Sequence, residues 1–236
     1  MGIRERKERE KGARREEIID AAQRVFFAKG VAFATMDDIA EAAELSKGTL
    51  YLYYKSKEDL YLAVTMRGMD AMLGMFTRAL STGEPTIKLI ANLGEAYYDF
   101  FNSQRDFFRM FYFFENPQFH TQVSPEMLQQ CKESDRRVWD LVIGLIQRGI
   151  DEGMLHRGLD PMEAGLMLWS NSNGIMRLID RSDKYWGEMM NVDLEAILRK
   201  SNALLVEAMM TEKAKQLFPS WLLYHHEGVD GADEKH

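Results

Sequence analysis

The residues between Thr35 and Lys57 include the side-chain types that bind nucleic acid. Thr35 and Ser46 carry hydroxyl groups, and residues 47–57 hold three lysines and three tyrosines. Lysine and hydroxyl side chains bind phosphates, and side chains that reach into a groove contact base edges. This combination favours a surface that contacts the phosphate backbone and base edges of DNA.

Two short helices around a tight turn are expected to position these side chains. Thr35 can cap the first helix, with Asp37 and Asp38 in its first turn, where carboxylates suit the positive end of a helix dipole. Ile39, Ala40 and Ala43 are spaced by three or four residues, which gives this helix one apolar face. The segment 44–46 (ELS) is predicted to form the turn.

Ser46 can cap the second helix, which is predicted to run to Tyr54. Leu50 and Tyr54 are four residues apart and therefore share one face. The opposite face is small, polar, basic and aromatic, and is formed by Lys47, Gly48, Thr49, Leu52 and Tyr53. A third helix begins near Ser56, with early acidic residues.

A longer pattern extends these features over residues 13 to about 62. It includes REEIIDAA (15–22), DIA (38–40), SKGTLY (46–51) and YKSK (54–57), together with Phe26, Lys29, Gly30 and Thr35. The pattern resembles the DNA-binding head of the TetR family of transcriptional regulators. The resemblance covers roughly a fifth of the chain and runs through three consecutive helices, which makes it more specific than a single short motif.

Two positions depart from the family pattern. Members usually have glycine where Glu44 stands, and glycine tolerates a left-handed backbone, so Glu44 must be strained or the helix must end differently. Tyr53 and Tyr54 stand where histidine and phenylalanine are common. The departure at Tyr53 bears on the base or phosphate contact, and the Tyr54 hydroxyl needs a partner or access to water.

The resemblance implies an all-α protein with an N-terminal three-helix helix-turn-helix head, a C-terminal helical body and about nine helices. By matched position, it assigns Thr49 and Tyr53 to base or groove contact. It assigns phosphate contact to Arg14, Thr35, Ser46, Lys47, Tyr51, Lys55 and Lys57, and Gly48 lies on the same DNA-binding face. A homodimer is expected, because paired heads can bind the two halves of a palindromic operator in double-stranded DNA.

Composition is typical of a globular protein, with 46% hydrophobic and 28% charged residues among 236. No apolar run reaches the roughly 18 residues of a membrane span, and the charged N-terminus (MGIRERKEREK) has no apolar core and is unlike a secretory signal. The single cysteine, Cys131, excludes an internal disulfide and fits a reducing cytoplasm. We therefore expect a cytoplasmic protein without a membrane partner.

Charge is distributed unevenly along the chain. Residues 1–57 hold 12 basic and 10 acidic residues, a net of +2, whereas the totals of 30 and 37 leave 18 and 27 for the remainder, a net of −9. An acidic body with a basic head is expected to bind DNA through one end.

The sequence divides into a charged leader (1–12), a helix-turn-helix domain (13–60), a helical ligand-binding and dimerisation domain (61–226) and a disordered tail (227–236). The leader is predicted to be a helical or frayed extension, because its glutamates nearly alternate with its basic residues. A basic arm that reaches DNA is the alternative. Phe33 is expected to fill the small core of the head.

Residues 85–119 hold 11 of the 26 aromatic residues. Most are expected to pack in the core, while a subset lines a cavity for a hydrophobic or aromatic small molecule. Asn171, Asn173 or Tyr112 can meet a polar end of that ligand. The predicted ligand-binding residues are Tyr97, Phe101, Phe108, Phe111, Tyr112, Trp139, Met167, Asn171 and Asn173.

Two long apolar helices late in the chain, at about 161–180 and 192–210, are predicted to form the dimer interface. The polar patch at 170–174 (SNSNG) permits close approach of helices, or contact with a ligand. We expect interface contact first.

No catalytic set, metal-ligand cluster or cofactor motif is visible in the sequence. The most consistent function is a ligand-responsive regulator, a repressor released from its operator by a hydrophobic molecule. The alternative is a helical small-molecule-binding or scaffolding protein with a degenerate head, and an enzyme is a third candidate. DNA-binding assays separate the first two, and any catalytic turnover would favour the third.

Overall fold

The computed structural model describes residues 2–114 and 121–219. Within these ranges the regular structure consists of ten α-helices and one π-helical segment, and the only other pairing there is an isolated bridge between Leu155 and Met210. The predicted all-α class is therefore confirmed. The short helix α11 (Glu212–Leu217) was not expected from the sequence. The predicted tail (227–236) lies outside the described residues.

The chain forms two compact units, and neither is continuous in sequence. The first comprises Met1–Met72 and Gln104–Arg137, and the second Leu73–Ser103 and Val138–His236. Helices α4 (Lys57–Leu80) and α8 (Pro125–Asp151) contribute residues to both units. The expected head, residues 13–60, lies within the first unit, which also takes in the start of α4 and α6 (Arg105–Phe114).

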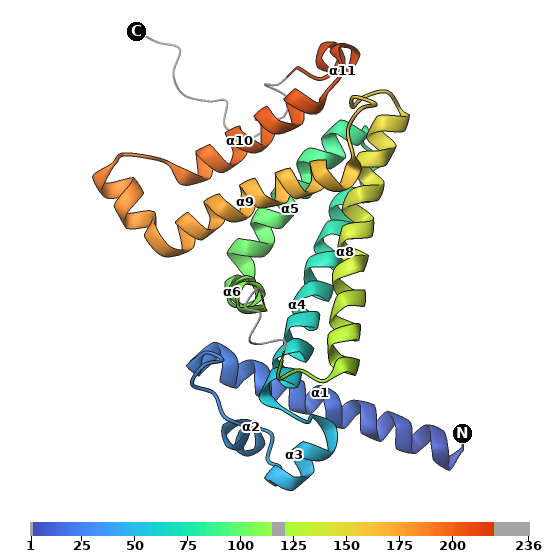
Figure 1. The fold of residues 1–236 in the computed structure, drawn as a ribbon, viewed down its shortest axis with the longest axis vertical. Coiled ribbons are helices and arrows are strands. Elements are labelled where there is room, and N and C mark those ends of the chain that lie inside the picture. The colour runs from blue at the N-terminus through green and yellow to red at the C-terminus, as the bar shows by residue number, and fades with distance from the viewer. Residues whose placement is uncertain (1, 115–120, 220–236) are drawn as a thin grey trace. The chain divides into compact units, whose positions relative to one another are not determined.

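The first unit is built around α1 (Ile3–Lys29), α2 (Met36–Ala42) and α3 (Lys47–Tyr53), which Figure 1 shows next to one another. Its core contains the fully buried Ile18, Ile39, Leu50 and Leu60. Aromatic contacts extend this core: Phe26 meets Tyr61 of α4 edge-on at 5.7 Å, and Phe27 meets Phe107 of α6 at 5.1 Å. The helix-turn-helix is thereby supported by packing of α1 against α4 and α6.

The helical extension expected for the leader is observed, because α1 begins at Ile3 and continues without a break to Lys29, although the first helix was expected to start only at Ala13. The expectation for Phe33 is wrong. Phe33 does not fill the core. Its side chain is 81% exposed, because Phe26, Ala34 and Met36 already occupy the interior beside the loop between α1 and α2.

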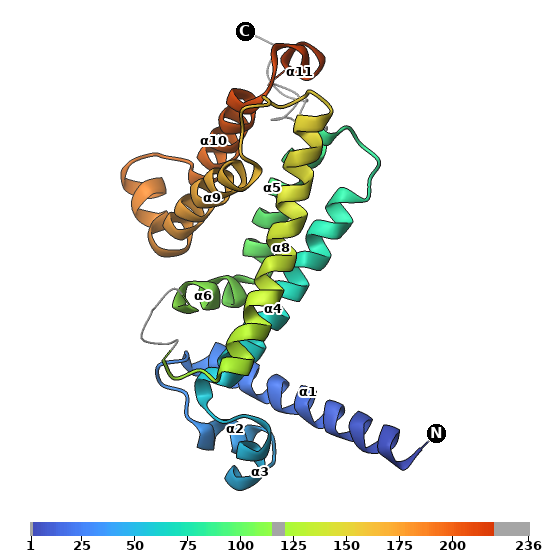
Figure 2. The same ribbon diagram turned by 45° about the vertical axis from the view of Figure 1, so that its right-hand side comes forward.

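The second unit contains α5 (Thr86–Ser103), α9 (Pro161–Lys184), the π-helical segment Tyr185–Met189, α10 (Leu194–Met209) and α11. Helices α9 and α10 pack along each other, as both views of the ribbon show (Figures 1 and 2). The apolar core of this unit draws mainly on α5, the second half of α8, α10 and the residues that follow α8 and α10, and includes Ile87, Leu89, Ile90, Leu145, Ile146, Leu155, Val206 and Met210.

Candidate nucleic-acid interface

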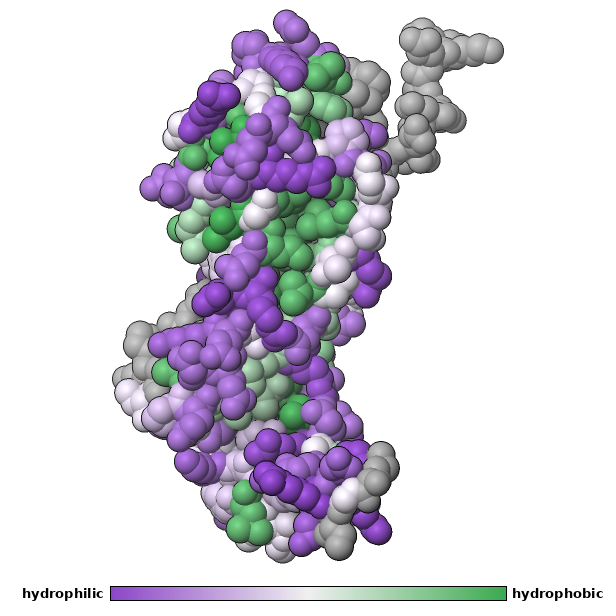
Figure 3. All heavy atoms as spheres, turned by 90° about the vertical axis from the view of Figure 1, so that its right-hand side faces the viewer, coloured by the Kyte–Doolittle hydropathy of each residue, from purple (hydrophilic) through white to green (hydrophobic). Residues whose placement is uncertain are grey.

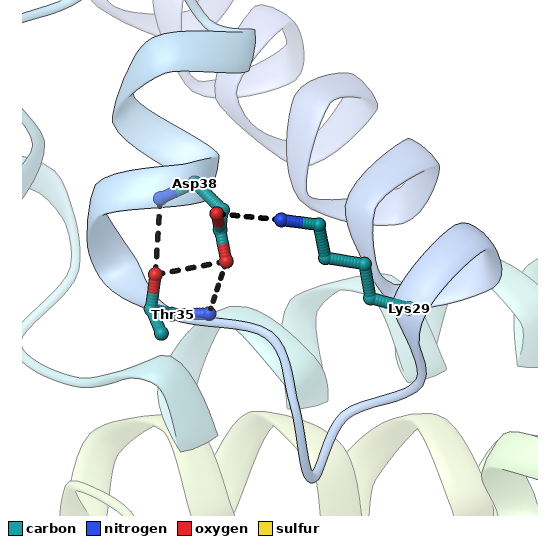
Figure 4. A network of polar contacts seen from close by, with 3 residues as sticks. All are labelled: Lys29, Thr35 and Asp38. Atoms are coloured by element: carbon teal, nitrogen blue, oxygen red, sulfur yellow. Dashed lines mark hydrogen bonds and ion pairs between the residues drawn. The ribbon is translucent and has the colours of Figure 1, made fainter.

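A network of polar contacts fixes the start of α2 (Figure 4). The Thr35 hydroxyl accepts from the Asp38 backbone N–H at 3.1 Å, and the Asp38 carboxylate accepts from the Thr35 backbone N–H at 3.0 Å, which is a capping box. Lys29, at the end of α1, reaches the same carboxylate at 2.7 Å. The hydrogen bonds from Lys29 and then Thr35 lower the pKa of Asp38. The predicted cap at Thr35 is therefore present, and it is coupled to the end of α1.

The turn between α2 and α3 places Glu44 in the left-handed region, with a φ of 55°. Leu45 N–H donates to the Ala40 carbonyl at 2.9 Å and Glu44 N–H donates to the Glu41 carbonyl at 3.0 Å. These two bonds define a Schellman motif, in which glycine is the usual residue at the position of Glu44. Of the two possibilities expected for Glu44, the strained backbone is the one observed.

Helix α3 is capped by Ser46, whose hydroxyl accepts from the Thr49 N–H at 3.1 Å. Leu50 is fully buried and Tyr54 is 6% exposed, so the predicted inner face is confirmed. Burial raises the pKa of the Tyr54 hydroxyl to about 12. Because this face is held in the core, the opposite face of α3 is presented outward.

That outward face carries the predicted base-contact and phosphate-contact side chains. Lys47 and Gly48 are exposed, Tyr51 is 44% exposed, and Thr49 and Tyr53 are partly exposed. Lys47 pairs with Asp37 of α2 at 2.8 Å, and this hydrogen bond raises the pKa of the Lys47 ammonium. The ion pair orients Lys47 between the two helices while leaving it accessible to a phosphate.

The start of α4 is anchored within the first unit. Lys57 donates from Nζ to the Val31 carbonyl at 2.8 Å, so its ammonium supports the loop between α1 and α2. Ser56 accepts from the Asp59 N–H at 3.0 Å and donates to the Gln122 carbonyl at 3.2 Å, and the buried Asp59 carboxylate accepts from the Ser124 N–H at 2.8 Å. A phosphate contact by Lys57 stays a prediction, and it would compete with the bond to Val31.

Two further predicted phosphate ligands are exposed cations. Arg14 pairs with Glu17 on the next turn of α1 at 2.6 Å, and Lys55 lies 3.8 Å from Glu126. Both pairs are exposed ion pairs, which contribute little to stability and exchange readily for a phosphate partner. Arg14, Thr35, Ser46, Lys47 and Lys55 all belong to the first unit.

Leu52 was recognised in the sequence as part of the outward face of α3, but was not included among the predicted DNA-binding residues. Its side chain is 82% exposed on a seven-residue helix whose other leucine, Leu50, is fully buried. An aliphatic side chain at such a position can contact the methyl group of thymine in the major groove. The sequence indicates this exposure, because Leu52 is two residues from the buried Leu50 and therefore lies on the opposite side of the helix.

The predicted ligand-binding residues are divided between the two units. Phe108 and Phe111 of α6 belong to the first unit, and Phe108 is fully buried. Tyr112 lies in α6, but its side chain is outside the described part of the structure. Six predicted residues belong to the second unit: Tyr97, Phe101, Trp139, Met167, Asn171 and Asn173.

In the second unit the predicted polar side chains have partners within the chain. The buried Tyr97 hydroxyl donates to the Asn173 side-chain oxygen at 2.8 Å, which links α5 to α9. Asn171 donates to Ser201 at 2.9 Å and to Asn202 at 2.7 Å across the α9–α10 contact. The 170–174 patch therefore lies partly in a helix–helix interface, which agrees with the first of its two expected roles.

The apolar residues among the predicted ligand-binding residues of the second unit differ in their exposure. Phe101 is fully buried, and Trp139 meets Trp169 edge-on with ring centroids 6.1 Å apart. Met167, by contrast, is 55% exposed.

Cys131 lies in the first unit and is buried. This burial raises the pKa of its thiol to about 12, which makes it a poor nucleophile.

The described ranges hold neither a candidate metal site nor a candidate membrane span. Residues 2–114 and 121–219 contain no group of three or more histidine, cysteine, aspartate or glutamate side chains placed to hold a metal ion. None of the helices in these ranges is long and apolar enough to cross a membrane.

A capped helix-turn-helix with its inner face buried and a polar, basic and aromatic face outward defines a DNA-binding regulator. Comparison with known families supports this class: residues 18–64 match the model of the bacterial regulatory proteins of the tetR family. The transcriptional activator FasR of Mycolicibacterium smegmatis is 30% identical over 173 residues, which cover 73% of this chain and 72% of FasR. The chain belongs to the TetR family of transcriptional regulators.

Other relatives and solved structures agree with this assignment. The repressor KstR2 of Mycolicibacterium smegmatis is 24% identical over 63% of this chain and 70% of its own. FadR of Bacillus subtilis, solved with stearoyl-CoA, has a TM-score of 0.63 at 21% identity and covers 82% of this chain and 98% of its own. SmeT, solved with triclosan, has a TM-score of 0.62 at 19% identity and covers 94% of this chain and 100% of its own. These relatives are transcriptional regulators, and the two structural similarities support the fold.

Proposed function

We propose that this protein is a homodimeric, ligand-responsive regulator that binds a palindromic operator through the outward face of α3. The observation that carries the proposal is the orientation of α3, with Leu50 and Tyr54 buried and Thr49 and Tyr53 on the accessible side. In this arrangement Thr49, Tyr53 and Leu52 contact bases. Arg14, Thr35, Ser46, Lys47, Gly48, Tyr51, Lys55 and Lys57 contact the backbone or line the groove.

The proposed dimer is formed through α9 and α10. Both helices expose large apolar side chains: Met162 (46%), Leu166 (47%) and Trp169 (38%) on α9, and Ile197 (42%) and Leu204 (52%) on α10. The spacing of these residues by three, four or seven places them along one side of each helix. Apolar side chains gathered in this way are typical of protein–protein interfaces.

The proposed effector is a hydrophobic small molecule that releases the protein from DNA, which makes the protein a repressor. Support comes from the aromatic composition of α5 and α6, and from two structural neighbours whose bound molecules each carry a large apolar group, the acyl chain of stearoyl-CoA and the chlorinated rings of triclosan. FasR is an activator and KstR2 a repressor, so the direction of regulation has to be measured. A hundredfold loss of DNA affinity requires a ligand preference of about 2.7 kcal/mol for the released conformation.

Sequencing the DNA fragments that the purified protein retains from its own genome tests the DNA-binding part of this proposal. A palindromic consensus is expected, and retention without any consensus contradicts sequence-specific regulation. On the selected operator, Tyr53→Ala should change the preference among base variants. Lys57→Ala should weaken binding to all variants alike and lower the salt slope by about one. Equal effects of both substitutions on sequence preference would show that these roles are wrong.

Thermal-shift screening tests the ligand-binding part. Long-chain acyl-CoA thioesters and chlorinated phenols are the first compounds to try, and each compound that stabilises the protein is then titrated against the operator complex. Phe111→Trp is expected to change the response to an active compound while leaving DNA binding without ligand intact. If no apolar compound stabilises the protein or releases it from DNA, the effector proposal fails while the DNA-binding proposal stands.

A further inference from the structure

The N-terminal extension of α1 carries basic residues in a helical series. Arg4, Lys7, Lys11 and Arg14 follow one another at alternating spacings of three and four residues, and no acidic residue interrupts the series. Residues at these spacings lie along one side of an α-helix. Residues 2–12 hold five basic and three acidic residues that are mixed along the sequence, so this one-sided arrangement appears only when the segment is helical.

Three acidic residues of α1 have partners that do not belong to this basic series. Glu5 accepts from the Gly2 N–H at 3.0 Å, Glu10 pairs with Arg6 at 2.7 Å, and Glu16 pairs with Arg67 of α4 at 2.7 Å. By contrast, Arg4, Lys7 and Lys11 are exposed and form no ion pair within the described residues. Glu8 flanks the series without belonging to it. We call Arg4, Lys7 and Lys11 the basic stripe.

The basic stripe faces the same side of α1 as the helix-turn-helix. Continuing its spacing along α1 leads to Ile18, Ala21 and Val25, all of which are buried. Residues on both sides of this buried line reach α2: Arg24 donates to the Ala42 carbonyl at 3.1 Å, and Lys29 pairs with Asp38 at 2.7 Å.

The other side of α1 faces the rest of the first unit. There Arg67 of α4 binds Asp20 at 2.6 Å and Gln23 at 3.0 Å, in addition to Glu16. This cluster fixes the rotation of α1 about its axis. The stripe is therefore held on the side of α2 and α3, away from the side that Arg67 occupies.

The extension runs past α2 and α3, as both ribbon views show (Figures 1 and 2). Figure 3, which looks at the N-terminal end of α1, shows a strongly hydrophilic surface there. At a rise of 1.5 Å per residue the stripe from Arg4 to Lys11 spans roughly 10 Å, which corresponds to about three base pairs of B-DNA. A helical segment of this length can follow a few consecutive phosphates.

We infer that the basic stripe of α1 is a second DNA-binding surface, which contacts phosphates beyond those held by the helix-turn-helix. This inference rests on the proposed DNA-binding function and adds a partner surface outside residues 18–64, the part that matches the family model. Its occupant is the backbone of double-stranded DNA, because the stripe is positively charged, unpaired and continuous with the face that packs on α2. The contact is independent of sequence, so it adds affinity and salt dependence without adding base specificity.

The test compares two variants that remove the same charge from the same helix. Lys7→Gln with Lys11→Gln removes two cations from the stripe, and Arg6→Gln with Arg9→Gln removes two cations from outside it. Glutamine has a helix propensity close to those of lysine and arginine, so α1 is retained in both variants, and circular dichroism verifies this. Binding is measured over a range of salt concentrations on the selected operator, extended by about ten base pairs on each side, a length chosen to exceed the span of the stripe.

The stripe variant is expected to lower the salt slope by about two and to weaken binding at least tenfold at about 0.1 M salt, while its preference among operator variants is unchanged. The control variant should bind like the wild type. An equal loss of affinity in both variants would show that only the net charge of the helix matters, and would overturn the inference. Binding of the stripe variant with the affinity of the wild type would also overturn it. Failure of the wild type to bind any operator would instead contradict the proposed function.

Discussion

Glu44 occupies a backbone conformation that glycine adopts at lower cost. Its φ of 55° is required by the Schellman motif that ends α2 and turns the chain toward α3. A non-glycine residue in the left-handed region costs roughly 1–2 kcal/mol, and Asn and Asp are the side chains that reduce this cost by local hydrogen bonding. The turn that orients the DNA-binding helix is therefore formed against a local penalty.

Replacing Glu44 by glycine should stabilise the protein. We expect Glu44→Gly to raise the free energy of unfolding by about 1 kcal/mol or somewhat less, because part of the gain is offset by the greater freedom of glycine in the unfolded chain. Urea denaturation measures the change. Glu44→Ala is the matched control, since it removes the carboxylate but keeps the Cβ, and it should give no comparable gain. Equal stabilisation by alanine and glycine would show that charge, rather than backbone strain, is responsible.

At the scale of elements, short helices depend on their ends. Helix α2 has seven residues, which is too short to be stable alone, and its start is fixed by Thr35, Asp38 and Lys29. Because the same carboxylate also binds the end of α1, the cap sets the geometry between two elements of the head. Its contribution depends on the ionisation of Asp38.

This dependence predicts a change of stability with pH. The pKa of Asp38 is lowered in the folded protein relative to its ordinary value of 3.8, so the stabilisation is fully present above that value and is lost as the pH falls through the folded pKa. Wild type should therefore exceed Asp38→Asn in stability at about pH 7, and the difference should shrink below about pH 4. Urea denaturation over this pH range measures it. A difference that stays constant with pH would show that the ionised carboxylate is not the cause.

A second element-level contact lies between α4 and α6 in the first unit. A Cβ added at Gly68 would lie 2.7 Å from the nearest ring atom of Phe107, whose side chain is 5% exposed and packs on Phe27. Glycine at this position therefore allows the two helices to approach closely. Glycine is therefore required at position 68 by the packing of the two helices, and not by the backbone conformation of a turn.

Gly68→Ala should accordingly destabilise the protein, by about 1–3 kcal/mol, because the ring of Phe107 must move. Gly74→Ala in the same helix is the control, since its nearest neighbour is the end of the Arg78 side chain at 3.6 Å. The control should be neutral or stabilising by up to about 1 kcal/mol, since alanine favours a helix more than glycine does. Thermal and urea denaturation of both variants decide the matter. Similar behaviour of the two variants would mean that the Phe107 contact relaxes freely.

At the scale of the whole molecule, the proposed function depends on pairing two heads. One helix-turn-helix reads only a few base pairs, so specific binding to a palindrome requires a dimer. Within the described residues, α9 and α10 offer an apolar face for this purpose that the folded chain leaves exposed. A charge placed in such an interface would lack a partner when the dimer forms.

Ile197→Arg is expected to dissociate the dimer, at a cost of several kcal/mol for the unpaired buried charge. Sedimentation velocity should then show monomers, and the affinity for the operator should fall as the dimer is lost. Leu217→Arg is the matched control, since Leu217 is 55% exposed on α11, and this variant should remain dimeric and bind DNA. A stable dimer of Ile197→Arg would place the interface elsewhere on the molecule.

The sequence by itself determined the all-α class, the caps at Thr35 and Ser46, and the inner face formed by Leu50 and Tyr54. These features depend on local rules, namely hydroxyl caps and the periodicity of apolar residues, which act within a few positions of one another. The strain at Glu44 was one of the two possibilities expected from the sequence, because both follow from one residue type at one turn. The end of the first helix and the bounds of α4 follow from the same local signals.

Tertiary structure decided what no local pattern specifies. The exposure of Phe33, the bond from Lys57 to Val31 and the pairing of Asn171 with Ser201 and Asn202 each depend on residues distant in sequence. The same holds for the basic stripe. Its residues were visible in the sequence, but its direction depends on Arg67 of α4, which fixes the rotation of α1 about its axis. Side-chain spacing defines the faces of a helix, and only the packing of other helices decides which of those faces remains free to bind DNA.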